Sequence, residues 1–141
     1  MRRFAVPAVA AATLSAALLM PAVAEATPGS GVTQRTISRT TIGDTDYILV
    51  ELTLAPGAST GWHSHPGPIY SSVRSGTLTH DLADCHHEEA FSQGETFVDH
   101  AKEVHLGRNL GTTKTVLIGL AVLPHGAPFG ADATDPGCGF R

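Results

Sequence analysis

The 141-residue chain has no block of lysine or arginine residues, and its formal net charge of −4 is small. Nucleic acids are therefore poor candidate partners, because their recognition needs clustered positive charge. The chain also has no glycine-rich phosphate loop, no nucleophile-elbow motif and no identifiable carboxylate pair for glycoside hydrolysis. Phosphoryl transfer, serine hydrolysis and glycoside hydrolysis thus have no support in the sequence.

The sequence also lacks helix signals. No segment keeps a 3.6-residue hydrophobic period with capping residues over ten positions. The 15 glycines and nine prolines instead separate short runs rich in β-branched and aromatic residues. We expect a turn at residues 56–59 and strands at residues 35–42, 46–56, 61–65, 69–74, 77–82, 96–99, 103–109 and 114–123. This pattern predicts an all-β sandwich or barrel.

The beginning of the chain has the features of a secretory signal peptide. Two arginines precede an apolar run, and small residues in an A-x-A pattern end it at about Ala26. Two prolines in the run disfavour the alternative, a membrane anchor. We expect a signal peptide at residues 1–26, a flexible leader at 27–33 and one domain at 34–141 with an irregular tail. After cleavage no membrane span would remain, and the protein would be extracellular or periplasmic.

Cysteine is rare, with Cys85 and Cys138 as the two instances in the chain. Export would place both in an oxidising compartment, where an even cysteine count favours a disulfide. Such a bond would hold the tail against the body of the domain. The alternative is two free, buried thiols.

The stretch "GWHSHPGPIY" at residues 61–70 carries the strongest chemical signal. His63 and His65 share strand parity, so both imidazoles would point to one face. His105 lies on another expected strand, from which it can reach the same point. Three converging imidazoles are a credible ligand set for a divalent transition metal. The alternative is that His63 and His65 are ordinary loop histidines.

Two motifs around these histidines resemble those of the cupin superfamily. The matching residues are Gly57, His63, His65 and Gly76 in the first motif and Gly94, His105 and Asn109 in the second. The resemblance extends over about residues 34–123 and implies a double-stranded β-helix, a jelly-roll type of barrel. It also implies a divalent transition metal inside the barrel (Fe, Cu, Ni, Zn, Mn or Co), with His63, His65 and His105 as its ligands.

The sequence departs from the cupin pattern at Ile69, which stands where the family has a glutamate. That side of the site would be apolar, and a three-histidine metal would keep two or three positions open for water or substrate. Tyr70 would replace the glutamate only if the strand bulges. His100 occupies the proline position of the second motif and is a candidate proton relay. The remaining histidines are expected to be solvated, with a second metal site at His86 and His87 as an alternative.

The three-histidine pattern resembles that of some cupins, among them thiol dioxygenases. The resemblance implies an exported, metal-dependent oxidoreductase of dioxygenase type that acts on a small organic molecule. Metal-dependent isomerases and lyases, a non-catalytic binding module for a metal or small ligand, and a domain with an empty site stay open. A homodimer formed through edge strands also stays open.

Overall fold

The computed structural model of the chain describes residues 29–140. The expected signal peptide at residues 1–26 lies outside this range and stays a prediction. Residues 29–140 contain strands and connecting segments, and among them no helix is long and apolar enough to cross a membrane.

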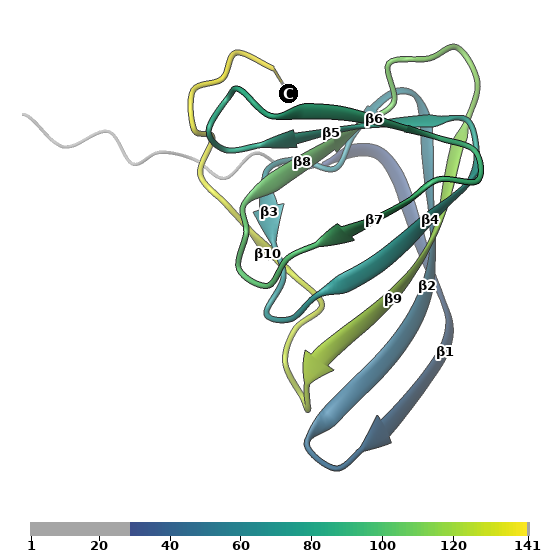
Figure 1. Ribbon diagram of the computed structural model, residues 1–141, viewed down its shortest axis with the longest axis vertical. Helices are drawn as coiled ribbons and strands as arrows, with labels where there is room; N and C mark the ends of the chain where they lie inside the picture. Colours follow the sequence, from purple (N-terminus) through teal and green to yellow (C-terminus); the bar gives the residue numbers. More distant parts are fainter. Residues whose placement is uncertain (1–28, 141) are drawn as a thin grey trace, which may run out of the picture.

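The strands form two layers (Figure 1). Side chains of both layers line a cavity. The strands are β1 (Ser30–Ile42), β2 (Thr45–Ser59), β3 (His63–Ser64), β4 (Ile69–Ser75), β5 (Thr77–Leu82), β6 (Glu88–Ser92), β7 (Thr96–Asp99), β8 (His105–Arg108), β9 (Thr115–Pro124) and β10 (Ala131–Asp132). One layer, here called the long-strand layer, has the order β1-β2-β9-β4-β7. The other, here called the histidine layer, has the order β6-β5-β8-β3-β10. Ser59 of β2 pairs with Arg108 of β8 and joins them. The prediction of a double-stranded β-helix is thereby confirmed.

Alternation along β2 and β9 decides which side chains enter the interior. On β2, Ile48, Val50 and Leu54 are buried and share one parity. On β9, every second residue from Thr115 to Leu123 is buried. The two strands pair in register over ten residue pairs, so their inward faces form one continuous wall. Burying an aliphatic side chain stabilises the fold by about 1.5–3 kcal/mol. This burial keeps the wall on the inside of the domain, where Val50 and Leu117 line the cavity.

Four segments differ from the sequence prediction. Residues 30–33, expected as part of a flexible leader, form the start of β1 and pair with β2. The expected turn at 56–59 lies within β2, which passes through Gly57 with a φ of 76°. Glu88 and Glu89, which lie outside the expected strands, begin β6. The expected irregular tail contains β10, which pairs with β3. In each case pairing with another strand overrides a weak local signal, whether that strand is a neighbour in sequence, as for β1 and β6, or a distant one, as for β10.

The tail after β9 is fixed against the histidine layer. Cys138 forms a disulfide with Cys85, 53 residues away, as the cysteine count predicts. Phe140 packs on Trp62 with 5.8 Å between the ring centroids, and the Arg108 guanidinium lies 4.5 Å from the Phe140 centroid. Figure 1 shows the tail returning to the connection between β5 and β6. The tail is therefore part of the packed domain.

Candidate metal centre

Three histidines from the histidine layer surround one point. His63 lies in β3, His65 directly follows that strand, and His105 begins β8 opposite His63. The ring centroid of His63 is 4.8 Å from that of His65 and 4.3 Å from that of His105. One ligand nitrogen from each of the three lies within 4.8 Å of the others. The structure thus brings together the three residues that the sequence motifs single out.

Backbone carbonyls fix the orientation of each of these rings. Each Nδ1–H donates to one carbonyl oxygen: that of Gly61 for His63 at 2.9 Å, that of Phe129 for His65 at 2.9 Å, and that of Glu103 for His105 at 3.0 Å. Because a carbonyl can only accept, the proton of each neutral ring is on Nδ1 and the lone pair is on Nε2. Metal-binding histidines are held in this manner. The donor set therefore fits a divalent transition metal.

Burial also keeps the three imidazoles neutral. It lowers the pKa of His63 and of His105 to about 4, and it lowers the pKa of His65 as well. Neutral imidazole is the form that binds a metal. At neutral pH, a metal would therefore meet three ligands that have no proton to release.

Two further residues of the site, His80 and Asp99, were not identified from the sequence. His80, expected to be solvated, is only 8% exposed, and its Nε2–H donates to Oδ1 of Asp99 at 3.0 Å. The same carboxylate oxygen lies 3.5 Å from Nε2 of His105. His80, Asp99 and His105 form a second group whose ligand atoms lie within 4.8 Å of one another. His105 therefore belongs to both groups.

Asp99 is a buried carboxylate beside a cluster of imidazoles. Burial alone would raise the pKa of Asp99, but the hydrogen bond from His80 and the electrostatic interaction with the neighbouring imidazoles outweigh it and lower that pKa. Asp99 is therefore ionised at neutral pH. The expectation that this side of the site is purely apolar is wrong, because the carboxylate lies next to Ile69 in the neighbouring strand.

The strand pattern contains a signal for both missed residues. On β7, Asp99 shares the parity of Phe97, which also lines the cavity. On β5, His80 shares the parity of the buried Leu78. The signal is weak, because Thr79 and Asp81, of the opposite parity on β5, are buried too. A strand that is covered on both faces gives no clean alternation from which to assign the inward face.

Ile69 and Tyr70 of the first motif and His100 of the second motif lie in different environments. Ile69 is 4% exposed and lines the cavity, whereas Tyr70 is 52% exposed on the outer face of β4. His100 is exposed in the turn after β7 and does not line the histidine cavity. Tyr70 and His100 are therefore not part of the site, since alternation turns Tyr70 outward and β7 ends at the residue before His100. At the end of β7 the residue that points into the cavity is Asp99.

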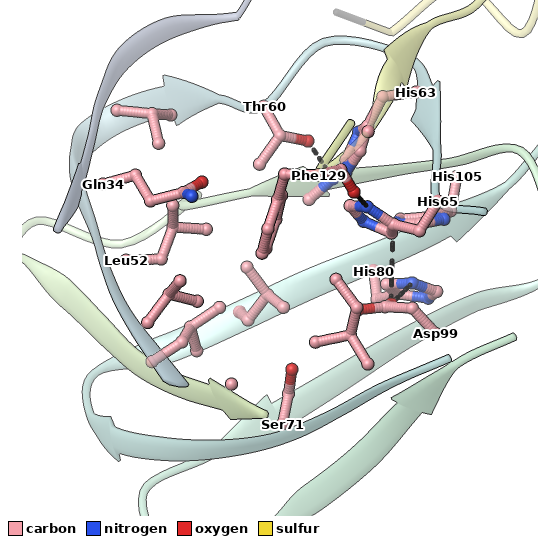
Figure 2. A pocket seen from close by; sticks show the side chains of 18 of the residues that line it. Gln34, Leu52, Thr60, His63, His65, Ser71, His80, Asp99, His105 and Phe129 are labelled. Atoms are coloured by element: carbon pink, nitrogen blue, oxygen red, sulfur yellow. Dashed lines mark hydrogen bonds and ion pairs between the residues drawn. The ribbon is translucent and has the colours of Figure 1, made fainter. Parts of the chain in front are cut away.

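The cavity has a volume of about 240 Å³ and two chemically different ends (Figure 2). One end holds the four imidazoles and the Asp99 carboxylate. The other is lined mainly by apolar side chains, which are Val32, Val50, Leu52, Ile69, Leu78, Phe97, Leu117 and Phe129. Gln34, Thr60 and Ser71 add uncharged polar groups along the wall.

The tail contributes directly to this cavity. The Phe129 ring packs edge-on against His65 with 5.3 Å between centroids, and Figure 2 shows it entering the cavity. Gly130 lies so close to His65 that a Cβ there would be 3.0 Å from Nδ1. No sequence motif pointed to these residues, because their contact with His65 joins positions 64 residues apart.

The other histidines, Trp62 and Asn109 lie on the surface or have roles in packing and in holding the backbone. His86 and His87 are exposed outside the histidine cavity, and Asp84 pairs with His87 and raises its pKa. Trp62 is fully buried. Asn109 donates to the carbonyl oxygens of Leu54, Ala55 and Thr113 and so fixes the connection after β8.

The family model of the cupin domain matches residues 50–122, slightly more than half of the chain. The chain belongs to the cupin family. The match contains His63, His65, Ile69, Asp99 and His105, so the whole candidate centre except the tail lies within the cupin domain. No curated protein matches the sequence.

Solved structures share the fold of this cupin at low sequence identity. The polyketide cyclase RemF from Streptomyces resistomycificus is 20% identical with a TM-score of 0.61, over 84% of this chain and 90% of that one. Rru_A2000 from Rhodospirillum rubrum, a cupin-2 domain, is 11% identical with a TM-score of 0.63, over 77% and 69%. KdgF from Halomonas sp. is 20% identical with a TM-score of 0.54, over 64% and 78%. At these identities the similarity shows a shared fold and nothing about activity.

Proposed function

We propose that this cupin is a metal-dependent enzyme that acts on a small organic molecule, with oxidation of the dioxygenase type as its reaction. The carrying observation is the convergence of three Nε2 lone pairs, from His63, His65 and His105, on one end of a cavity whose other end is mainly apolar. A redox-active divalent metal held there, such as iron or copper, would supply Lewis acidity and electron transfer.

The residues of the chain have separate roles in this proposal. His63, His65 and His105 hold the ion and leave coordination positions open toward the cavity. The carbonyls that accept from their Nδ1–H groups keep the rings aimed. Ile69 excludes water from its side of the reacting end, which strengthens electrostatic interactions there.

The shape of the cavity limits the substrate class. Its volume of about 240 Å³ is below the range of about 300–1,000 Å³ typical of drug-sized ligands. Its walls offer Gln34, Thr60 and Ser71 as hydrogen-bonding groups, and no lysine or arginine lines it. We therefore expect a small, largely apolar substrate with one anionic or chelating group that reaches the metal.

Metal content and oxygen uptake test the proposal. Protein purified without a histidine tag should bind about one transition-metal ion per chain. Its metal-dependent oxygen consumption should be measured with catechol, flavonol and thiol substrates. His105→Ala should lose both properties. His86→Ala should keep both, because His86 is exposed outside the cavity. A protein that binds none of Fe, Cu, Ni, Zn, Mn or Co would overturn the proposal.

A metal-dependent isomerase or lyase is the second candidate. The observation that favours it is the ionised Asp99 carboxylate beside the ligand cluster, since such reactions need a group that accepts and returns a proton. Product formation without oxygen consumption would support this class. Tight metal or ligand binding without any turnover would instead identify a binding module.

Export belongs to the same proposal. It is supported by the signal-like residues 1–26 and by the Cys85–Cys138 disulfide, because such bonds persist in oxidising compartments. Expression of the full chain with fractionation of the cells tests it. A protein that stays in the cytoplasm at its full mass would contradict it.

A further inference from the structure

We propose that Asp99 supplies a carboxylate ligand to the metal centre, from β7 instead of from the β4 position at which the cupin pattern has a glutamate. The inference rests on the proposed metal function. It adds a fourth protein ligand, contributed by the long-strand layer, and a preference among metal ions.

The strand pairing places the carboxylate beside the missing glutamate. Ile69 on β4 and Asp99 on β7 are direct antiparallel partners. Partners of this kind project to the same face of a sheet, with Cβ atoms about 4.5–5.5 Å apart. Both residues line the cavity, with only 4% and 6% of their surface exposed. Asp99 therefore enters the cavity next to the position where Ile69 offers no ligand atom.

The contact between Asp99 and His105 points to a cation. Because Nδ1–H of His105 donates to the Glu103 carbonyl, Nε2 of the neutral ring carries a lone pair. Oδ1 of Asp99, another acceptor, lies 3.5 Å from that nitrogen. A charge-assisted hydrogen bond would be shorter, at about 2.7–2.9 Å. Two ligand atoms that are each about 2.1 Å from one tetrahedral ion are about 3.4 Å apart, so Asp99 and His105 have the spacing of two ligands of one ion. The Asp99 carboxylate does not lie within 4.8 Å of the His63 and His65 ligand nitrogens as well, so it would have to move toward them when the ion binds.

His80 positions this carboxylate. Its Nε2–H donates to the same Oδ1 at 3.0 Å, and its ring stacks on that of His105 with 5.0 Å between centroids. Both side chains of the His80–Asp99 pair are 9% exposed, so bulk water does not compete for the bond. His80 thereby holds the carboxylate toward His105, as outer partners hold metal ligands elsewhere.

The carboxylate changes the charge at the centre. Three neutral imidazoles would leave the full 2+ charge of the ion, whereas Asp99 reduces the net charge to 1+. Hard ions such as Mn²⁺ favour carboxylate oxygen, while Zn²⁺ and Cu²⁺ are well served by imidazole nitrogen. Asp99 should therefore strengthen the binding of Mn²⁺ more than that of Zn²⁺.

Asp99→Asn tests the inference through metal affinity. We expect Mn²⁺ affinity to fall by about 100-fold or more, since even loss of an outer partner lowers affinity by about 10- to 100-fold. Zn²⁺ affinity should fall less, and the visible absorption of the Co²⁺ form should change with its coordination. Asp44→Asn is the control, because Asp44 is exposed in the turn between β1 and β2. Equal losses for Mn²⁺ and Zn²⁺ would overturn the ligand role.

Rescue and positioning variants sharpen the test. Ile69→Glu added to Asp99→Asn returns a carboxylate to the same wall and should restore Mn²⁺ affinity to within about 10-fold of the wild type.

His80→Leu should lower Mn²⁺ affinity by about 10-fold, and His80→Gln, which keeps an N–H donor, should lower it less. If Asp99→Asn does not fold, the two His80 variants carry the test. Equal affinities in those two variants would then contradict it.

The two proposals fail in distinguishable ways. If Asp99→Asn binds Mn²⁺ and Zn²⁺ as the wild type does while His63→Ala binds neither, Asp99 is not a ligand and the three-histidine centre stands. If the folded wild-type protein binds neither ion, the proposed metal function itself is wrong.

Discussion

The two layers of this cupin contribute different chemistry to one cavity. The histidine layer supplies His63, His65, His80 and His105, each held by a hydrogen bond to a carbonyl or carboxylate oxygen. The long-strand layer supplies aliphatic side chains from β2, β4 and β9, and it adds one carboxylate, Asp99, at its edge strand β7. The histidine layer is thus built for directed contacts, and the long-strand layer for burial and volume.

The difference teaches which changes should affect binding and which should affect stability. Replacing one of the metal-site histidines removes a ligand nitrogen that no neighbouring side chain replaces. Replacing an aliphatic side chain opens space but leaves the ligand atoms where they are. Variants in the two layers should therefore separate metal affinity from the free energy of unfolding.

The largest effect is expected in the histidine layer. His63→Ala, His65→Ala and His105→Ala should each lower metal affinity by about 100-fold or more, because each removes a direct ligand where even outer partners matter by about 10- to 100-fold. Metal analysis after equilibrium dialysis, with circular dichroism as a check on folding, measures this. Should all three variants keep one ion per chain, the centre lies elsewhere.

Removal of the disulfide should lower both stability and metal affinity. Cys85→Ala with Cys138→Ala frees a 53-residue loop, which in the chain-entropy model lowers the free energy of unfolding by about 4 kcal/mol. Metal affinity should fall too, because the tail carries the Phe129 carbonyl that orients His65. Urea denaturation and metal titration test the two effects. Unchanged metal affinity in the folded variant would show that the tail holds its place without the bond.

Leu117→Ala tests the long-strand layer. Leu117 is 6% exposed and lines the apolar end, so its truncation should lower the free energy of unfolding by about 2–5 kcal/mol. Metal affinity should stay within a factor of about two, because no ligand moves. A loss of affinity comparable to that of the histidine variants would contradict the separation between the layers.

Acid should weaken the metal-free protein between about pH 6.5 and pH 4. The pKa of His63 and of His105 is lowered by burial from 6.5 to about 4. In this window the unfolded chain binds more protons, so stability falls as the pH falls, by up to about 1.4 kcal/mol per pH unit for each histidine. Urea denaturation at several pH values measures the slope. His105→Gln should flatten the slope, and an equally steep profile would argue against buried neutral imidazoles.

The smallest effect is expected at Gly130. In Gly130→Ala the new methyl group would lie 3.0 Å from Nδ1 of His65 and would disturb its hydrogen bond to Phe129. We expect metal affinity to fall by up to about 10-fold, with little change in melting temperature. Isothermal titration of metal-free protein measures this. An affinity equal to that of the wild type would mean that the ring adjusts without cost.

Part of the site could be predicted from the sequence because it depends on local spacing. The His-x-His pair has a period of two, which directs both rings to one side of a strand. The same alternation gave the opposite orientations of Ile69 and Tyr70, in agreement with the structure. The cupin motifs supplied the long-range partner, His105. His80 was assigned to solvent because a histidine on a strand covered on both faces has no distinguishing pattern.

The sequence by itself determined most of the strands, although not β6 or β10, and the presence of three histidines in cupin register. Only the tertiary structure decided that Asp99 lies beside Ile69, that His80 is buried against it, and that the tail orients His65. The physical reason is that side-chain alternation is a property of one strand, whereas the neighbours of a residue depend on which strands pair. The pairing of β4 with β7 and the return of the tail to β3 each join segments far apart in the chain, and no local pattern encodes them.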